Sequence, residues 1–351
     1  MAIDSGTSAT GTEFSSDIPL ELQGRAAGEA AAGLGPYQLA RRRLRRNRAA
    51  LAFGALFALI LVLCLLAPVY AHDIAHTGPN DNHITETVKV GGKLETVVNA
   101  IGLPIGPTWH SRFFLGADTN GRDVAVRLLY GGRNSLEVGS VATLITMLLA
   151  TIIGVVAGYS RGLLDGLLTR ALDVIWAYPV VILGVALGAI LAVSGIDLGV
   201  VKLSGSSLLV PAVVIGVVYV PYVAKPIRGQ VLGLREREFI DAARVQGQGN
   251  LRIMFSEVLP NVGSTVIVFV PLMLANAILL EAGLSYLGAG VQPPNPSWGT
   301  MIADGISSIP AAIHLVLVPG IMLVLGVLSI NVFGDGVRDA LDPRAKIRIG
   351  R

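Results

Sequence analysis

The stretch Glu238-Phe-Ile-Asp-Ala-Ala-Arg-Val-Gln-Gly247, which continues through Asn250-Leu-Arg-Ile to Leu259-Pro260, decides how this chain is interpreted. It is charged and helix-prone, and it lies between long apolar runs. Gly247 interrupts it, because glycine readily adopts the left-handed conformation that ends helices. Pro260 suits the first turn of the helix that follows. The pattern predicts two short amphipathic helices at a membrane surface, either as a docking surface for a partner or as helices that lie on lipid headgroups.

The composition around this stretch is typical of a membrane protein. The 351 residues are 52% hydrophobic and only 15% charged, and the mean hydropathy is +0.65. Several runs of about 20 residues carry no charge, which is the length that a helix needs to cross a bilayer. The single cysteine, Cys64, lies inside one of these runs, so no intrachain disulfide is possible.

Six apolar segments are expected to cross the membrane as helices, because a backbone inside lipid must satisfy its own hydrogen bonds. They lie at about 49–71, 136–159, 172–193, 208–225, 262–283 and 313–333. Basic residues cluster before the first segment, between the fourth and fifth, and after the sixth. Such residues are retained on the cytoplasmic side, so both termini are expected there. A nucleic-acid-binding role for the first basic cluster is the weaker interpretation, since it adjoins an apolar span.

The expected architecture is an all-α membrane protein with six transmembrane helices and both termini in the cytoplasm. The expected organisation is a disordered cytoplasmic tail over 1–40, a basic segment and first transmembrane helix over 41–71, an extracytoplasmic loop over 72–133, a core with five transmembrane helices over 134–336 that includes the cytoplasmic loop 228–260, and a cytoplasmic tail over 337–351.

Glycines and prolines inside the apolar segments suggest close packing and bends. Gly154 with Gly158 and Gly184 with Gly188 are spaced four apart, which can let two helix backbones approach closely. Such glycines are also simply common in membrane helices. The prolines can bend helices or mark ordinary helix ends, as expected for Pro211; they are Pro179, Pro211, Pro221 and Pro271.

Catalytic and metal-binding patterns are not found in the sequence. No phosphate-binding Gly-x-x-x-x-Gly-Lys-Ser/Thr element occurs, so the chain is not expected to hydrolyse nucleotide. His72 and His76 are four apart but have no Cys or Glu in ligand register, so a metal role is not favoured. Asp173 and Glu281 are expected near span ends and not at mid-depth, which argues against an ion-driven carrier.

The cytoplasmic loop resembles the segment that defines ABC importer permeases. Asp241-Ala-Ala243 is followed after three residues by Gly247 and after eleven more by Leu259-Pro260. In that family the pattern is Glu-Ala-Ala, three residues, Gly, nine residues, Ile, one residue, Leu-Pro. The spacing is intact here, with Asp241 in place of the Glu and Glu257 in place of the Ile.

Five further stretches resemble the C-type permease subunit of dipeptide and oligopeptide importers. They are Leu115-Gly-Ala-Asp-Thr-Asn-Gly-Arg-Asp-Val124, Tyr130-Gly-Gly-Arg-Asn-Ser-Leu136, Gly283-Leu-Ser-Tyr-Leu-Gly288, Gly290-Val-Gln-Pro-Pro294 with Pro296-Ser-Trp-Gly299, and Gly334-Asp-Gly-Val-Arg-Asp-Ala-Leu-Asp-Pro-Arg344.

The resemblance implies a type I ABC importer permease fold in the bacterial cytoplasmic membrane. It implies half of a channel for di- or oligopeptides, with a B-type permease as the other half, one or two ABC ATPase subunits, and an extracytoplasmic peptide-binding protein. It implies no cofactor, metal or nucleic acid on this chain, since ATP and Mg²⁺ are bound by the ATPases. It assigns ATPase coupling to Glu238, Asp241, Ala242, Ala243, Arg244, Gly247, Leu259 and Pro260.

Two questions stay open at this stage. Related permeases with these motifs carry other solutes, such as glutathione, nickel or an opine-like compound, while an ion-coupled secondary transporter is the less favoured alternative. The outer loop is longer than expected for this branch, and we expect its insertion around Asp73–Thr108 to contact the binding protein.

Overall fold

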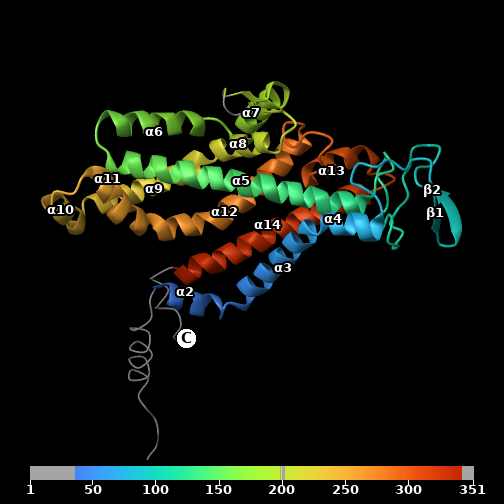
Figure 1. Cartoon of the computed structure of the whole chain (residues 1–351), viewed down its shortest axis with the longest axis horizontal. Helices are drawn as coiled ribbons and strands as arrows, with labels where there is room; N and C mark the ends of the chain where they lie inside the picture. Colours follow the sequence, from blue (N-terminus) through green and yellow to red (C-terminus); the bar gives the residue numbers. More distant parts are fainter. Residues whose placement is uncertain (1–35, 198, 200–201, 342–351) are drawn as a thin grey trace, which may run out of the picture.

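The computed structural model describes residues 36–197, 199 and 202–341, and it shows an elongated bundle of helices (Figure 1). The helices are α2 (Pro36–Leu44), α3 (Arg48–Leu65), α4 (Ala67–Val69), α5 (Val124–Tyr159), α6 (Leu163–Trp176), α7 (Val180–Ser194), α8 (Leu209–Val218), α9 (Val220–Arg235), α10 (Glu238–Val245), α11 (Asn250–Ile253), α12 (Leu259–Tyr286), α13 (Trp298–Gly305) and α14 (His314–Leu341). Shorter elements are π-helical turns at Tyr70–Ala75 and Met254–Val258, a 3-10 turn at Ile306–Ser308, and the strands β1 (Thr87–Val90), β2 (Lys93–Thr96), β3 (Ile196–Asp197) and β4 (Lys202–Leu203).

The described residues contain five helical segments that are long and apolar enough to span a membrane. They are Arg48–Leu65, Val124–Tyr159, Leu209–Arg235, Asn250–Tyr286 and His314–Leu341. The number rises to six if α6 and α7 together count as one bent span. The predicted all-α architecture with up to six spans is therefore confirmed.

The third span differs from the prediction of one helix over about 172–193. The helix begins earlier, at Leu163, and α6 and α7 meet at an angle of 89° around Tyr178 and Pro179. Proline lacks a backbone N–H, and its ring disfavours a helical conformation in the residue before it. Pro211 lies in the first turn of α8, which agrees with its predicted place at a helix end.

Other predicted boundaries shift because capping residues extend the helices. The helix α5 begins at Val124, before the predicted end of the outer segment at 133, since the Asp123 carboxylate accepts hydrogen bonds from the first backbone N–H groups of α5. At the first span, helical turns continue past 71 to Ala75, and α14 runs past 336 to Leu341. In the predicted disordered tail 1–40, Pro36–Ala40 is helical, because α2 packs on α14. The remaining tail residues, 1–35 and 342–351, lie outside the described part.

The long helix α5 forms the centre of the bundle and packs on α8, α9 and α12. The two predicted glycines allow its close contact with α9. A Cβ added at Gly154 would lie 2.8 Å from the carbonyl oxygen of Ala224, and one at Gly158 would lie 2.8 Å from that of Arg228. These distances are too short for any side chain, so the small-residue spacing does mark a helix–helix contact.

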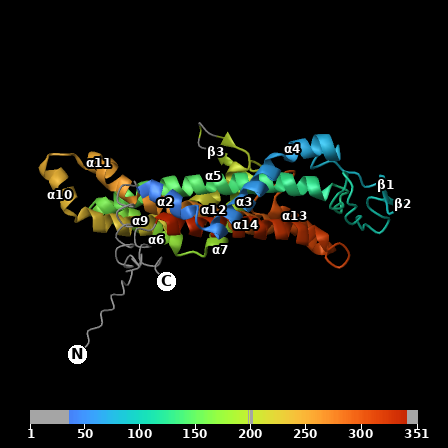
Figure 2. The same cartoon turned by 90° about the horizontal axis from the view of Figure 1, so that it is seen from below.

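The loop before α5 folds into a small lobe at one end of the bundle, while α10 and α11 lie at the opposite end (Figures 1 and 2). The lobe contains the antiparallel hairpin β1–β2 and a core of its own, formed by Val97, Val98, Ile105, Phe113 and Ala117. The molecule therefore has two distinct ends that are joined by α5.

Candidate functional site

The helix pair α10–α11 has the shape that its sequence predicts. Gly247 adopts the left-handed conformation, with φ of +77°. The N–H of Gln248 donates to the carbonyl of Ala243 over 3.1 Å, and the N–H of Gly247 donates to that of Arg244 over 2.9 Å. These are the two hydrogen bonds of a Schellman motif, in which a glycine closes a helix C-terminus. The predicted glycine break is confirmed.

The apolar residues of α10 divide into buried and exposed groups. Ile240 is 0% exposed and Ala243 is 3% exposed, and both join the core that α5 and α9 form. Phe239 and Val245, which the sequence pattern grouped with them, are exposed. The pattern could not separate the two groups because α10 is only 8 residues long. One side of α10 therefore anchors it, and the other presents apolar and charged groups to the surroundings.

A polar cluster fixes the orientation of α10 and α11 relative to α5. Arg244 Nη1 donates to Asp241 Oδ1 over 2.9 Å, and its guanidinium carbon lies 5.7 Å from the ring centre of Tyr159. The pKa of Arg244 is raised, with Tyr159 as the larger cause and Asp241 as a smaller one. The Tyr159 hydroxyl donates to Asn250 Oδ1 over 3.3 Å. The last residue of α5 thus contacts both short helices.

The residues predicted to couple to an ATPase fall into two places. Glu238, Asp241, Ala242, Arg244 and Gly247 are exposed on α10 and its glycine cap, whereas Ala243 is buried below them. Leu259 and Pro260 lie at the start of α12, after the π-helical turn that follows α11. They end the predicted loop and are not part of the exposed α10 surface.

Arg235 is a structural residue of this region whose role the sequence pattern does not predict. Its Nη1 lies 3.3 Å from the carbonyl oxygen of Gly158 and 3.2 Å from that of Ser160, at the C-terminal end of α5. These carbonyls have no partner within their helix, and an arginine satisfies them well. The only sequence signal is a basic residue in the last turn of α9. Arg235 therefore holds the base of the loop against α5.

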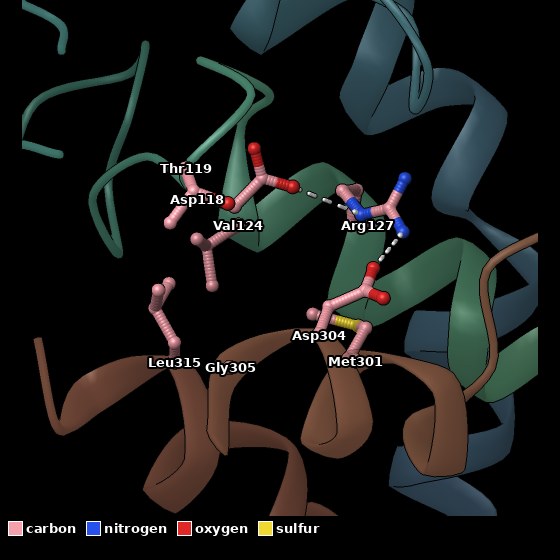
Figure 3. A pocket seen from close by; sticks show the side chains of 8 residues that line it. All are labelled: Asp118, Thr119, Val124, Arg127, Met301, Asp304, Gly305 and Leu315. Atoms are coloured by element: carbon pink, nitrogen blue, oxygen red, sulfur yellow. Dashed lines mark ion pairs between the residues drawn. The ribbon is translucent and has the colours of Figure 1, made fainter. Parts of the chain in front are cut away.

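The opposite end of the bundle carries a charge cluster that joins Asp118 and Arg122 of the 115–124 stretch to Arg127 and Asp304; Figure 3 shows the contacts of Arg127. Arg127 Nε lies 3.6 Å from Asp118 Oδ2, and Arg127 Nη2 lies 3.5 Å from Asp304 Oδ2 on α13. Arg122 Nε also contacts Asp118, over 2.6 Å. The cavity beside them measures about 20 Å³, which suits a water molecule and no larger ligand. We interpret this cluster as a tie between α13 and α5.

A second buried polar contact holds the segment between α12 and α13. The side chain of Glu281 is fully buried near the end of α12, and the Ser285 hydroxyl donates to its Oε1 over 2.6 Å. The N–H of Val291 donates to the same hydroxyl over 2.9 Å. The position of Glu281 near a helix end agrees with the prediction. Asp173 lies in the last turn of α6, three residues before its end at Trp176 and ten residues after its start at Leu163, and Lys225 Nζ contacts its Oδ1 over 2.9 Å.

No group of three or more His, Cys, Asp or Glu side chains that could hold a metal ion occurs in the described part of the chain. His72, one of the two histidines considered above, contacts the carboxylate of Asp73. Its side chain is 90% exposed, so the contact lies at the surface.

Comparison with known proteins adds the family. The family described as binding-protein-dependent transport system inner membrane component matches residues 150–347, and the N-terminal TM domain of oligopeptide transport permease C matches residues 35–85. The chain is 34% identical to the dipeptide transport system permease protein of Alkalihalophilus pseudofirmus, over 89% of this chain and 91% of that one. It is 36% identical to the glutathione transport system permease protein of Pectobacterium atrosepticum, over 69% of this chain and 75% of that one.

Among solved structures, a methionine ABC transporter in an inward-facing conformation aligns with 62% of this chain and 96% of its own, at a TM-score of 0.49 and 18% identity. The family match covers more than half of the chain, and the apolar helices agree with a multi-pass protein of the bacterial cytoplasmic membrane. The chain therefore belongs to the binding-protein-dependent inner membrane components, the permeases of ABC importers.

Proposed function

We propose that this chain forms half of the translocation pathway of an ATP-driven importer of di- and oligopeptides. Relatives named as dipeptide or oligopeptide permeases, which match over about nine tenths of their length, support a peptide cargo. The glutathione permease relative keeps a second cargo class open, although glutathione is itself a tripeptide. Nickel or opine-like solutes stay as further alternatives within the same class of machine. An ion-coupled secondary transporter is disfavoured, since the family depends on a binding protein.

The observation that carries the proposal is the exposed surface of α10, a helix whose opposite side is packed into the core. Ile240 and Ala243 anchor the helix in the core, and Tyr159 and Arg235 connect the loop to α5. A force on α10 is therefore transmitted to the central helix of the bundle. We assign the contact with an ATPase to Glu238, Asp241, Ala242, Arg244 and Gly247, with Ala243, Leu259 and Pro260 as its support.

Membership of the family supports the partners that we propose. A B-type permease completes the pathway, and one or two ATPase subunits bind ATP and Mg²⁺, so this chain needs no cofactor. An extracytoplasmic binding protein delivers the peptide to the end that carries the β1–β2 lobe. The channel has an inward-open and an outward-open state, and the ATPases bind one of them more tightly than the other. ATP binding and hydrolysis change which state is bound more tightly, and the channel shifts toward that state.

The proposal is tested with the complete transporter, purified with its partner subunits and placed in lipid. We expect peptide-loaded binding protein to stimulate ATP hydrolysis, whereas glutathione-loaded or unloaded binding protein does not. Stimulation by glutathione alone would replace the peptide assignment. Purification of this chain without any ATPase subunit would contradict the coupling role itself.

A further inference from the structure

An ion pair and two aromatic rings line the contact between α6 and α9. Lys225 Nζ lies 2.9 Å from Asp173 Oδ1 and 4.6 Å from the ring centre of Trp176. The ring centres of Trp176 and Tyr222 are 4.3 Å apart. We refer to Asp173, Trp176, Tyr222 and Lys225 as the α6–α9 face. None of them belongs to the cytoplasmic loop 228–260, which we call the coupling loop, or to the motifs that carry the family resemblance.

This face lies within the membrane and not at its surface. Asp173 is about ten residues from the start of α6, which corresponds to ~15 Å along the helix. On the neighbouring helix, Ala224 contacts Gly154, about five residues or ~8 Å from the end of α5 at Tyr159. The ion pair is therefore about 8–15 Å inside the helix ends, in a hydrocarbon region about 30 Å thick.

The charged groups of this face favour a polar surrounding over lipid. The side chain of Asp173 is 45% exposed in the isolated chain, and that of Lys225 is 32% exposed. Charged side chains within a membrane face a protein interior or a water-filled cavity, because facing hydrocarbon is costly. Another side of α6 is mostly apolar, with Leu163 86%, Leu167 68% and Val174 63% exposed, and Arg170 is the one charged residue on it. Past Arg170, toward the end of the helix, this side carries Val174 and suits lipid, whereas Asp173 and Trp176 face α9.

The break between α6 and α7 supports the same conclusion independently. The chain turns by 89° directly after Trp176, between two helices that together are apolar enough to form one span. Irregular backbone at membrane depth occurs only where it is buried in protein or lines an aqueous cavity. In other transporters, broken helices of this kind mark the substrate pathway.

We infer that the α6–α9 face lines the translocation pathway and contacts the peptide as it passes, an inference that rests on the proposed function. A peptide carries an ammonium group and a carboxylate, for which Asp173 and Lys225 are the matching partners. The indole N–H of Trp176 and the hydroxyl of Tyr222 have no hydrogen-bond partner among the described residues, so both are available to backbone amides. The two rings offer a surface for apolar side chains.

Accessibility to water tests the placement of this face. The chain has one native cysteine, Cys64, and it is buried, so a new cysteine gives a clean signal. In the complete transporter in lipid, we expect Trp176→Cys to react with a charged, membrane-impermeant thiol reagent at least about tenfold faster than Val174→Cys. Val174 is the matched control, because it lies on the same helix and is more exposed than Trp176 in the isolated chain. Equal rates, or faster labelling of Val174→Cys, would overturn the inference.

Transport tests the contact with peptide. We expect Asp173→Asn and Lys225→Gln to lower peptide uptake at least about tenfold, while ATP hydrolysis stimulated by loaded binding protein stays within about twofold of wild type. Asp165→Asn is the matched control, since Asp165 forms the other α6–α9 ion pair, with Arg228 over 2.7 Å near the helix end. An equal loss of uptake in this control would show that the pairs only hold the helices together.

A photoreactive dipeptide delivered by the binding protein provides a direct readout. We expect it to crosslink to the segment around Trp176 or Tyr222, and crosslinks confined to other parts of the chain would contradict the inference. Failure of the proposed function is distinguishable from failure of this inference. If the wild-type complex imports no peptide, the proposed function is wrong. The ratio of the labelling rates of Trp176→Cys and Val174→Cys still decides whether this face lines an aqueous path.

Discussion

Gly247 is the single residue on which the geometry of the coupling loop depends most directly. Its φ of +77° is strained for residues with a Cβ, at a cost of about 1–2 kcal/mol. A Cβ at this position would meet no other atom within 4 Å, so the cost arises from the backbone and not from a clash. A substitution here should therefore loosen the end of α10 without affecting membrane insertion.

We predict that Gly247→Val leaves the transporter assembled but uncouples peptide uptake from ATP hydrolysis. Gly247→Asn is the matched control, because asparagine tolerates the left-handed conformation. Hydrogen exchange at the last turn of α10 should accelerate in the valine variant and stay close to wild type in the asparagine variant. Normal uptake with Gly247→Val would remove the coupling assignment.

At the residue scale, the sequence indicated which side chains carry charge but not which of them anchor the loop. Glu238, Asp241 and Gly247 follow from a spacing that requires a helix and its end. The role of Arg235 depends on two carbonyls about 75 residues earlier in the chain, and the roles of Ile240 and Ala243 depend on the packing of α10. Contacts between residues so distant in sequence leave no trace in local periodicity.

The helix α5 begins where Asp123 places its carboxylate, and this cap also ties the helix to the outer lobe. Asp123 Oδ1 accepts the N–H of Ala125 over 2.8 Å, and Oδ2 accepts that of Phe113 over 2.6 Å. Burial raises the pKa of Asp123, and the backbone N–H groups oppose this effect. One side chain thus satisfies donors in two elements.

We predict that Asp123→Ala costs about 1–2 kcal/mol and loosens both the first turn of α5 and the loop around Phe113. Asp123→Asn retains one acceptor oxygen and should recover part of this loss, mainly at the helix. Thermal stability of the purified transporter, together with hydrogen exchange resolved to these two segments, would distinguish the variants. Equal protection in all three proteins would show that the carboxylate is not the cap that holds them.

At the element scale, apolar length predicted the existence of the spans better than their shape. Runs of about 20 uncharged residues require helices in lipid, which explains why up to six spans were found. The α6–α7 bend was not predicted, because a proline in an apolar run is compatible with either a kink or a helix end. The predicted start of this segment at about 172 places Asp173 next to its beginning, whereas α6 runs from Leu163 to Trp176 and Asp173 lies in its last turn, just before the bend.

At the scale of the whole molecule, α5 connects the two ends that we expect to bind partners. Its 36 residues extend over ~54 Å, well beyond the hydrocarbon thickness of about 30 Å. The first part of α5 carries Arg127, Arg133 and Glu137, so its N-terminal end projects out of the membrane and supports the lobe. The lobe is therefore placed to meet a soluble protein outside the membrane.

The hairpin β1–β2 offers a way to test this contact without unfolding the lobe. Thr87 pairs with Thr96, and the N–H of Val97 donates to the carbonyl of Glu86 over 2.8 Å, so the two ends of the hairpin are adjacent. Deletion of the whole insertion would instead remove Val97, Val98 and Ile105 from the lobe core, together with the Pro79 carbonyl that accepts from Arg127. A loss of activity in that larger deletion would not identify a contact.

We predict that replacing residues 89–94 by Asn-Gly, which favours a tight two-residue turn after the pair Val88–Glu95 and keeps Val88 on the lobe core, leaves thermal stability and basal ATP hydrolysis close to wild type. If the hairpin contacts the binding protein, the concentration of loaded binding protein that half-saturates ATP hydrolysis should rise about tenfold, which corresponds to ~1.4 kcal/mol of lost contact. The maximal rate should stay unchanged, because saturation restores the complex. An unchanged half-saturating concentration in a stable variant would exclude the hairpin and leave the rest of the lobe as the remaining candidate surface.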